Sequence, residues 1–337
     1  MIDIDFVVAW VDGGDPVWQE KKNKYWSEYY PERSMPKIAR DNTSSRYRDW
    51  GIFHYWFRSV EQNAPWVRKV YLVTDRQIPN FLTQSHPKLS IVFHDQYIPE
   101  EYLPTFNSRV IETNFHRIPG LSEFFVYFND DAFLNRQMKP EDFFRNGKPC
   151  YSFIERPIEP RCPVDSIQSA VLNDMGVINR HFTRKDILYH PNLYLNYRYG
   201  KHGLKNLLML PWPHYQHFAD DHMPCPFLKS TLIDVWEKAS DILDNTCRSR
   251  FRERDNVNQF LFKYWDLARG NFAPIYREPG YYLLQENNIN SCVRDIVEGI
   301  HPMVCVNDGD MTDIEMLSFR IQAAFQERYP QPCSFER

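Results

Sequence analysis

The sequence predicts an α/β fold with a largely parallel sheet, and three observations support this. Short apolar runs rich in β-branched and aromatic residues, typical of buried strands, lie at residues 5–11, 67–74, 89–94 and 124–128. Helical spacing of apolar residues between them, at residues 50–63 and 108–116, favours a strand and helix alternation. Two of the runs end in acidic turns, at Asp12 and at Asp130. Because ligands bind beyond the carboxyl ends of parallel strands, we expect both turns to border one site.

Length and composition indicate a folded chain and exclude several classes of protein. The 337 residues are 43% hydrophobic and 16% aromatic, which is enough for one large core or two modest ones. The formal net charge of -4 provides no overall basic field, so we expect no nucleic-acid partner. The seven cysteines are scattered without a CxxC pair, which argues against a disulfide scaffold or a zinc ribbon.

The N-terminus MIDIDFVVAW predicts a cytoplasmic protein. It is acidic where a secretion signal is basic, and its apolar run is too short to cross a bilayer. Peripheral association with the inner face of the membrane is left open.

The composition and regularity of the sequence change near residue 150. A proline-rich, irregular stretch at residues 149–161 is followed by a region rich in Tyr and His. We expect further helices at residues 166–179, 227–242, 256–269 and 314–328, and a strand near residues 303–306. The chain is therefore divided into an α/β core over residues 1–149 and a helical, loop-rich part over residues 150–337.

Two acidic turns are candidates for chemistry at strand ends. Asn129, Asp130 and Asp131 follow an apolar strand, and adjacent carboxylates there can hold a divalent cation against a diphosphate. A helix cap or an Asx-turn explains the same residues about equally well. Asp12 and Gly13 begin a DGGD turn, in which glycine lets the backbone approach a nucleotide, although a simple turn is an equal explanation.

Two later segments combine cations with groups that transfer protons. Residues 220–229 hold two carboxylates, His222 and Lys229, a set suited to acid/base chemistry beside a phosphate. Arginines alternate along residues 248–254 and could donate to phosphate oxygens. A single histidine more commonly has a structural role. Arginines in such a run more commonly form a solvent-exposed charged face.

Four segments in order together resemble the Stealth family of sugar-phosphate transferases, which are bacterial capsule enzymes related to the lysosomal-enzyme N-acetylglucosamine-1-phosphotransferase. The first is IDFVVAWVDGGDPVW at residues 4–18, and the second runs from YRDWGIFHYWF to VYFNDDAFL at residues 47–134. The third comprises HMPCPFLKSTL at residues 222–232 and RFRERDNVNQFLF at 250–262. The fourth comprises VCVNDGD at residues 304–310 and FQERYPQPCSFE at 325–336.

The resemblance implies a Rossmann-like, glycosyltransferase-type core and a reaction at phosphorus. A hexose-1-phosphate would move from a UDP-sugar such as UDP-N-acetylglucosamine to a glycan hydroxyl, with Mg²⁺ or Mn²⁺ as cofactor. It also implies site residues: Asp131, His222 and Arg252 as catalytic residues, with Arg250 and Arg254 as alternatives to Arg252; Asp130 and Asp131 as metal ligands; and Asp12, Gly13, Arg48, Asn107, Glu112, His116, Lys229, Asn307 and Asp308 as substrate-binding residues.

Two other functions remain open at this stage. A metal-dependent glycosyltransferase would use the same fold and donor but release UDP instead of UMP. A carbohydrate-binding module would use the many tyrosines and tryptophans for stacking, but it needs no cluster of carboxylate, imidazole and guanidinium groups.

Overall fold

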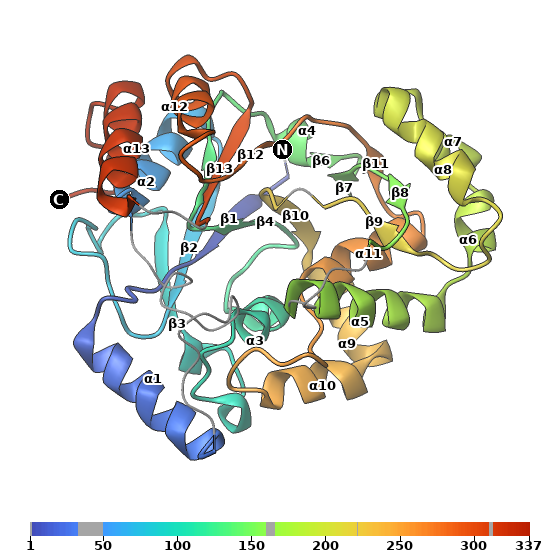
Figure 1. Ribbon diagram of the computed structural model, residues 1–337, viewed down its shortest axis with the longest axis horizontal. Coiled ribbons are helices and arrows are strands. Elements are labelled where there is room, and N and C mark those ends of the chain that lie inside the picture. Colours follow the sequence, from blue (N-terminus) through green and yellow to red (C-terminus); the bar gives the residue numbers. More distant parts are fainter. Residues whose placement is uncertain (1, 33–49, 160–165, 221, 310–312) are drawn as a thin grey trace.

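A five-stranded sheet forms the centre of the computed structural model, which describes residues 2–32, 50–159, 166–220, 222–309 and 313–337 (Figure 1). The strands lie in the order β10-β4-β1-β2-β3. Their bounds are Ile4–Ala9 for β1, Lys69–Thr74 for β2, Leu89–Phe93 for β3, Phe124–Asn129 for β4 and Cys225–Leu228 for β10. The first four are parallel and β10 runs antiparallel to β4. The predicted α/β fold with a largely parallel sheet is therefore confirmed.

Alternate residues of the strands face two separate hydrophobic cores, because side chains alternate between the faces of a sheet. Phe6 and Val8 pack in one core together with α2 (Phe53–Asn63), α12 (Ile289–Glu298) and α13 (Ile314–Arg328). Val7 packs in the other core, against the helices on the opposite face. These are α3 (Ser108–Thr113), α5 (Ser166–His181), α9 (Lys229–Lys238), α10 (Ser240–Arg248) and α11 (Phe260–Ala268). The sheet is thus a buried middle layer.

Helix α1 (Pro16–Tyr29) follows the DGGD turn and was not expected from the sequence. The Asp15 carboxylate accepts a hydrogen bond from the Val17 N–H, and Pro16 occupies the first helical turn, which is a favourable start for a helix. Trp18 and Trp26 on α1 pack against Phe106 and Phe251 in a third, small cluster.

Smaller sheets surround the main one. The strands β5 (Ala132–Leu134), β13 (Met303–Asn307) and β12 (Gly280–Leu283) form a three-stranded sheet in the order β12-β13-β5. A second three-stranded sheet contains β6 (Phe144–Arg145), β7 (Lys148–Tyr151) and β11 (Ala273–Pro274), next to α4 (Pro140–Phe143). Two strands, β8 (Glu155–Arg156) and β9 (His217–Phe218), pair with each other.

A small lobe lies between β8 and β9 in the sequence. It contains α6 (Arg184–Leu188), α7 (Pro191–Tyr194), a 3-10 helix (Tyr197–Gly203) and α8 (Leu204–Met209). Figure 1 shows α6, α7 and α8 at the outer edge of the molecule, on the opposite side from α12 and α13. No helix within the described ranges is long and apolar enough to span a membrane.

The structure differs from the sequence prediction in two helices of the second half. The helix expected at residues 227–242 begins as strand β10 and then breaks at Ala239 between α9 and α10. Phe227 pairs with Phe125 on β4, so pairing in the sheet overrides the local helical pattern. The helix expected at residues 256–269 begins only at Phe260, because the Asn258 side chain accepts from the Phe260 N–H.

The proposed division near residue 150 remains a prediction. β7 spans residues 148–151, and β10 contributes a strand from the second part to the main sheet.

Candidate active site

Asp131 and His222 lie close together beyond the carboxyl ends of β1 and β4. Asp131 sits in the turn between β4 and β5, where its backbone carbonyl accepts from Val306 N at 2.8 Å. Its Oδ2 accepts from Asn307 Nδ2 at 3.0 Å and lies 3.8 Å from His222 Nε2. Both side chains reach solvent, at 21% exposure for Asp131 and 37% for His222. A carboxylate and an imidazole are therefore accessible to a substrate at this edge.

The backbone of His222 is in an unusual conformation. Its φ is 48°, in the left-handed region that residues other than glycine rarely occupy. Such strain persists only where surrounding structure holds it, and it is common at functional sites. The segment after β9 thus presents the imidazole to Asp131 at a conformational cost.

Asn129 connects His222 to the interior of the protein. Its Nδ2 lies 3.4 Å from His222 Nε2, and its Oδ1 accepts from the Tyr127 hydroxyl at 2.7 Å. The same hydroxyl lies 3.1 Å from Oε1 of Glu112, a buried residue of α3. Tyr127 and Asn129 point to the same side of β4 because they are two residues apart. A continuous polar chain therefore runs from Glu112 to His222.

Arg252 approaches the other end of this chain. Its Nη2 donates to Ser108 Oγ at 2.8 Å, and its positive charge partly opposes the rise that burial causes in the pKa of Glu112. The loop that carries Arg252 is held by Asn107, the N-cap of α3. Asn107 Nδ2 donates to the Phe251 carbonyl at 3.2 Å and to Asn256 Oδ1 at 2.9 Å. Asn107 thus fixes the arginine loop against α3.

Burial raises the pKa of two groups in this chain. Desolvation raises the pKa of Glu112, and the opposing effects of Arg252 and of the Tyr127 hydrogen bond do not cancel it. Desolvation also raises the pKa of Tyr127 well above 10.0, assisted by the charges of Glu112, Asp130 and Asp131. The Tyr127 hydroxyl has one proton but two oxygen neighbours. A protonated Glu112 that donates to Tyr127, which donates to Asn129, satisfies both contacts.

The donor atoms at this edge suit a divalent cation only in part. Asp131, His222 and Cys305 each bring one ligand atom within 4.8 Å of the others. Oδ1 of Asp131 is buried and has no hydrogen-bond partner among the described residues, so it can take a ligand. The Cys305 thiol lies in β13, where desolvation followed by the Asp131 charge raises its pKa well above 9.0. Mg²⁺ and Mn²⁺ prefer oxygen to sulfur ligands, so carboxylate oxygen is the donor that fits either cation.

Asp12 and Gly13 lie at the same edge of the sheet as Asp131. Ala9 of β1 is paired with Asn129 of β4, so the two turns leave neighbouring parallel strands on one side. The Asp12 carboxylate accepts from Gly14 N at 2.8 Å, and its backbone N–H donates to Gln77 Oε1 at 2.9 Å. The DGGD turn is thus an ordered Asx-type turn beside the Asp131 turn.

His116 and Lys229 are not brought to this cluster. β10 runs antiparallel to β4, with Leu228 opposite Phe124, so Lys229 lies at the amino end of the parallel strands. His116 lies against Trp236 of α9, and burial followed by the charges of Arg117 and Lys229 lowers its pKa to about 3. Both residues therefore sit at the opposite edge of the sheet from Asp131.

Two other residues predicted for the site are Asp308 and Arg48. Asp308 directly follows Asn307 at the end of β13. Arg48 lies outside the residues that the structure describes.

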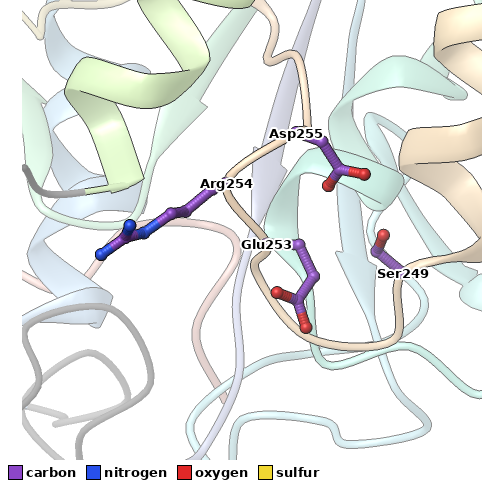
Figure 2. Close-up of a pocket in the computed structure, with 4 residues that line it drawn as sticks. All are labelled: Ser249, Glu253, Arg254 and Asp255. Atoms are coloured by element: carbon purple, nitrogen blue, oxygen red, sulfur yellow. The ribbon is translucent and has the colours of Figure 1, made fainter.

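A cavity of about 540 Å³ lies on the loop after α10, lined by Ser249, Glu253, Arg254 and Asp255. Figure 2 shows Arg254 extending away from the other three side chains. None of the residues of the Asp131 cluster lines this cavity. The cavity borders the loop that carries Arg252. The polar chain from Glu112 to His222 is the stronger candidate for a catalytic site.

Tyr127 and Cys305 were missed by the sequence reasoning. Tyr127 could have been found from the alternation within β4, since it lies two residues before Asn129 and shares its side of the sheet. Cys305 is brought near Asp131 only by the pairing of β5 with β13, in which it lies opposite Ala132. No local signal in the sequence reports that pairing.

Comparison with known proteins gives matches over the whole chain. Conserved region 1 of the Stealth proteins matches residues 3–30, and conserved region 2 matches residues 46–151. The capsular polysaccharide phosphotransferase WcwK of Streptococcus pneumoniae is 40% identical over 341 residues, which cover 100% of this chain and 99% of WcwK. The chain belongs to the Stealth family. It is an enzyme, and the predicted class of phosphotransferase is confirmed by the relatives.

Other Stealth relatives carry related names. The exopolysaccharide phosphotransferase cps2G of Lactiplantibacillus plantarum is 40% identical, covering 99% of this chain and 96% of cps2G. The receptor polysaccharide phosphotransferase WefC of Streptococcus oralis is 40% identical, covering 100% of both chains. A galactosyltransferase structure, LgtC with donor and acceptor sugar analogs, covers 95% of each chain at 8% identity with a TM-score of 0.34, a likeness too weak to bear on the site.

Proposed function

We propose that this Stealth protein transfers a sugar-1-phosphate from a UDP-sugar to a glycan hydroxyl in the synthesis of a capsular or other cell-surface polysaccharide. The sugar would be an N-acetylhexosamine, and the reaction would release UMP and form a phosphodiester. The names of the relatives support polysaccharide phosphotransfer. The observation that carries the proposal is the placement of Asp131 and His222 together at the ligand-binding edge of the sheet, 3.8 Å apart.

The residues at this edge provide what phosphoryl transfer needs. An acceptor hydroxyl must lose a proton as it attacks phosphorus, and the imidazole of His222 or the carboxylate of Asp131 can accept that proton. Negative charge develops on the oxygens of the leaving UMP and of the transferred group. The guanidinium of Arg252 is the cation that would neutralise it, since it has a fixed set of donors at the far end of the polar chain.

A divalent cation fits this site through oxygen ligands. Mg²⁺ is usually held by one or two carboxylates together with substrate phosphates. Asp131 would provide the protein ligand through its unpartnered Oδ1, and Asp130 lies near enough for its charge to raise the pKa of Tyr127. When bound, the cation would neutralise the diphosphate of the donor.

The nucleotide product tests the proposal directly. Full-length enzyme with UDP-N-acetylglucosamine, a glycan acceptor and Mg²⁺ is expected to release UMP. ³¹P NMR of the glycan product should then show a phosphodiester linked to C1, with the anomeric configuration of the donor kept because the C1–O bond is not broken. Release of UDP and a product without phosphorus would instead establish a metal-dependent glycosyltransferase.

A further inference from the structure

The lobe between β8 and β9 carries a concentration of exposed apolar side chains. Nearly half of the large apolar residues that the structure leaves exposed fall within residues 188–212. Three of them on α8, namely Leu204, Leu207 and Leu208, are 63%, 43% and 72% exposed. The set also includes Leu188, Tyr189, Leu195, Tyr197, Leu210 and Trp212. Patches of this kind on a soluble surface mark sites of interaction.

The exposure is a property of a well-anchored lobe and does not come from loose packing. Asn206, on the inner face of α8, is fully buried, and its amide donates to the carbonyls of Phe153 and Tyr194 at 2.8 and 2.7 Å. Arg184 on α6 forms a buried salt bridge with Glu155 of β8. The inner face of the lobe is thus held by hydrogen bonds to the protein body, while its leucines face outward.

The leucines of α8 share one side of the helix and have cations beside them. Leu204, Leu207 and Leu208 are spaced i, i+3 and i+4, so they form one apolar stripe opposite the buried Asn206 and Met209. Lys201 and Lys205 are exposed, four residues apart and next to the stripe. Apolar residues bordered by lysine are typical of helices that lie in the interface of a membrane.

The charge of the lobe is opposite to that of the whole chain. The chain has a formal net charge of -4, whereas residues 184–212 contain five Lys and Arg residues and a single acid, Asp186. Of these cations, Lys185, Arg198, Lys201 and Lys205 are exposed. A polar glycan would not require the leucines, and a second copy of this net acidic chain offers no general reason for the lysines. An anionic lipid surface uses both.

We propose that the outer face of residues 188–212 docks on the surface of a bilayer that contains anionic lipid, with the α8 leucines inserted among the acyl chains and lysines at the headgroups. Residues 213–220, which include β9, follow this face of the lobe in the sequence and lead toward His222. Docking would therefore hold the catalytic edge close to the membrane without a spanning helix. This interaction does not depend on which reaction the site catalyses.

Sedimentation of full-length protein with vesicles tests this surface without any substrate. Binding is expected to vesicles of equal parts phosphatidylcholine and phosphatidylglycerol, and it should weaken with salt; vesicles of phosphatidylcholine alone should bind much less. Leu208→Ser should weaken binding about tenfold, because it removes one inserted leucine. Replacing Lys201 and Lys205 by Gln should weaken it roughly fivefold for each lysine.

Phe319 on α13 provides a matched control. It is 73% exposed, much like Leu208, but belongs to α13, which Figure 1 shows on the opposite side of the molecule from α8, so Phe319→Ser should bind vesicles like the parent protein. Equal binding by Leu208→Ser and the parent, or no binding to the mixed vesicles, would overturn the proposal. So would a lipid-free dimer that Leu208→Ser converts to a monomer, since that would make the face a contact between two copies. UMP release with a water-soluble acceptor should be unchanged in Leu208→Ser, which separates this test from that of the reaction.

Discussion

Asn129 Nδ2 lies 3.4 Å from Nε2 of His222, although the two residues come from segments 93 positions apart. With the amide nitrogen facing the ring, Nε2 accepts from Asn129 in the tautomer that carries its proton on Nδ1. The Asn129 Oδ1 is occupied by Tyr127, which fixes the amide in this orientation. The end of β4 therefore orients the amide group that faces Nε2 of His222.

Replacing His222 by Ala should reduce the rate of UMP release by about 10²–10⁴-fold, the range typical for a general acid or base. The exposed His214 in the same region has no part in the cluster, so His214→Ala is expected to keep the parent rate. Rates should be measured with saturating donor so that the loss appears in kcat. Equal rates in the two variants would assign His222 a structural role.

Asp131→Asn should reduce turnover at least about a hundredfold and weaken the dependence on added Mg²⁺, because the oxygen that can bind the cation loses its charge. Excess chelator should abolish the activity of the parent. Cys305→Ser is the companion variant. Because Mg²⁺ prefers oxygen to sulfur as a ligand, the metal requirement of Cys305→Ser should stay that of the parent. A changed metal preference in Cys305→Ser would make the thiol a ligand.

Arg252→Lys should lower kcat about tenfold to a hundredfold, because an ammonium group cannot reproduce the planar set of guanidinium donors. The matched control is Arg254→Lys. Arg254 lies two residues further along the same loop, is exposed, and extends away from the cavity residues (Figure 2). Arg250 donates to the Pro104 carbonyl at 2.6 Å and so has a structural contact of its own. A larger loss in Arg254→Lys than in Arg252→Lys would move the phosphate contact to Arg254.

Tyr127→Phe should reduce kcat roughly fivefold, since it removes the hydroxyl that orients Asn129 and leaves the aromatic packing in place. Glu112→Gln should have a smaller effect near neutral pH. If Glu112 is protonated and donates to Tyr127, the amide of glutamine can donate in its place. The two variants are compared by kcat over a range of pH. A larger loss in Glu112→Gln than in Tyr127→Phe would show that an ionised Glu112 is required.

The central strands β1, β2 and β4 were predictable because they are buried on both faces and are therefore apolar along nearly their whole length. Because Asp12 and Asp131 both follow parallel strands, the position of their turns at one edge of the sheet could be predicted from strand direction. The position of Lys229, which is only seven residues after His222, could not be predicted in this way. The strand β10 runs antiparallel and carries Lys229 to the opposite edge of the sheet. The direction of a four-residue edge strand has no local signature.

The polar chain from Glu112 to His222 could not be predicted from the sequence either. Glu112, Tyr127 and Asn129 belong to an α3 and β4 contact that depends on packing within one core. In the sequence, Tyr127 resembles an ordinary apolar strand residue. Only the structure shows that its hydroxyl lies between Glu112 and Asn129. The family resemblance named Glu112 but provided no partner for it.

Asp174→Asn should stabilise the protein at neutral pH. Asp174 on α5 is fully buried, with Oδ1 accepting from Asn258 N at 3.1 Å and Oδ2 without a hydrogen-bond partner among the described residues. Burial raises its pKa well above 3.8, and the charges of Asp220 and Glu112 act in the same direction. The unfolded chain releases this proton at lower pH than the folded protein does. Folding stability is therefore lost as pH rises above about 4.

Asparagine keeps the accepting oxygen and cannot ionise, so Asp174→Asn should show a higher Tm at pH 7 and no advantage below about pH 4. Asp241 provides a control in which the same substitution should change the stability at pH 7 in the opposite direction. Its exposed carboxylate pairs with Arg180, chiefly through a hydrogen bond that lowers its pKa, so Asp241→Asn should lose a little stability at pH 7 and none in acid. Thermal unfolding of both variants at the two pH values checks the signs. A Tm for Asp174→Asn below that of the parent at pH 7 would mean that the ionised carboxylate, held by charges such as that of Arg109, stabilises this part of the core.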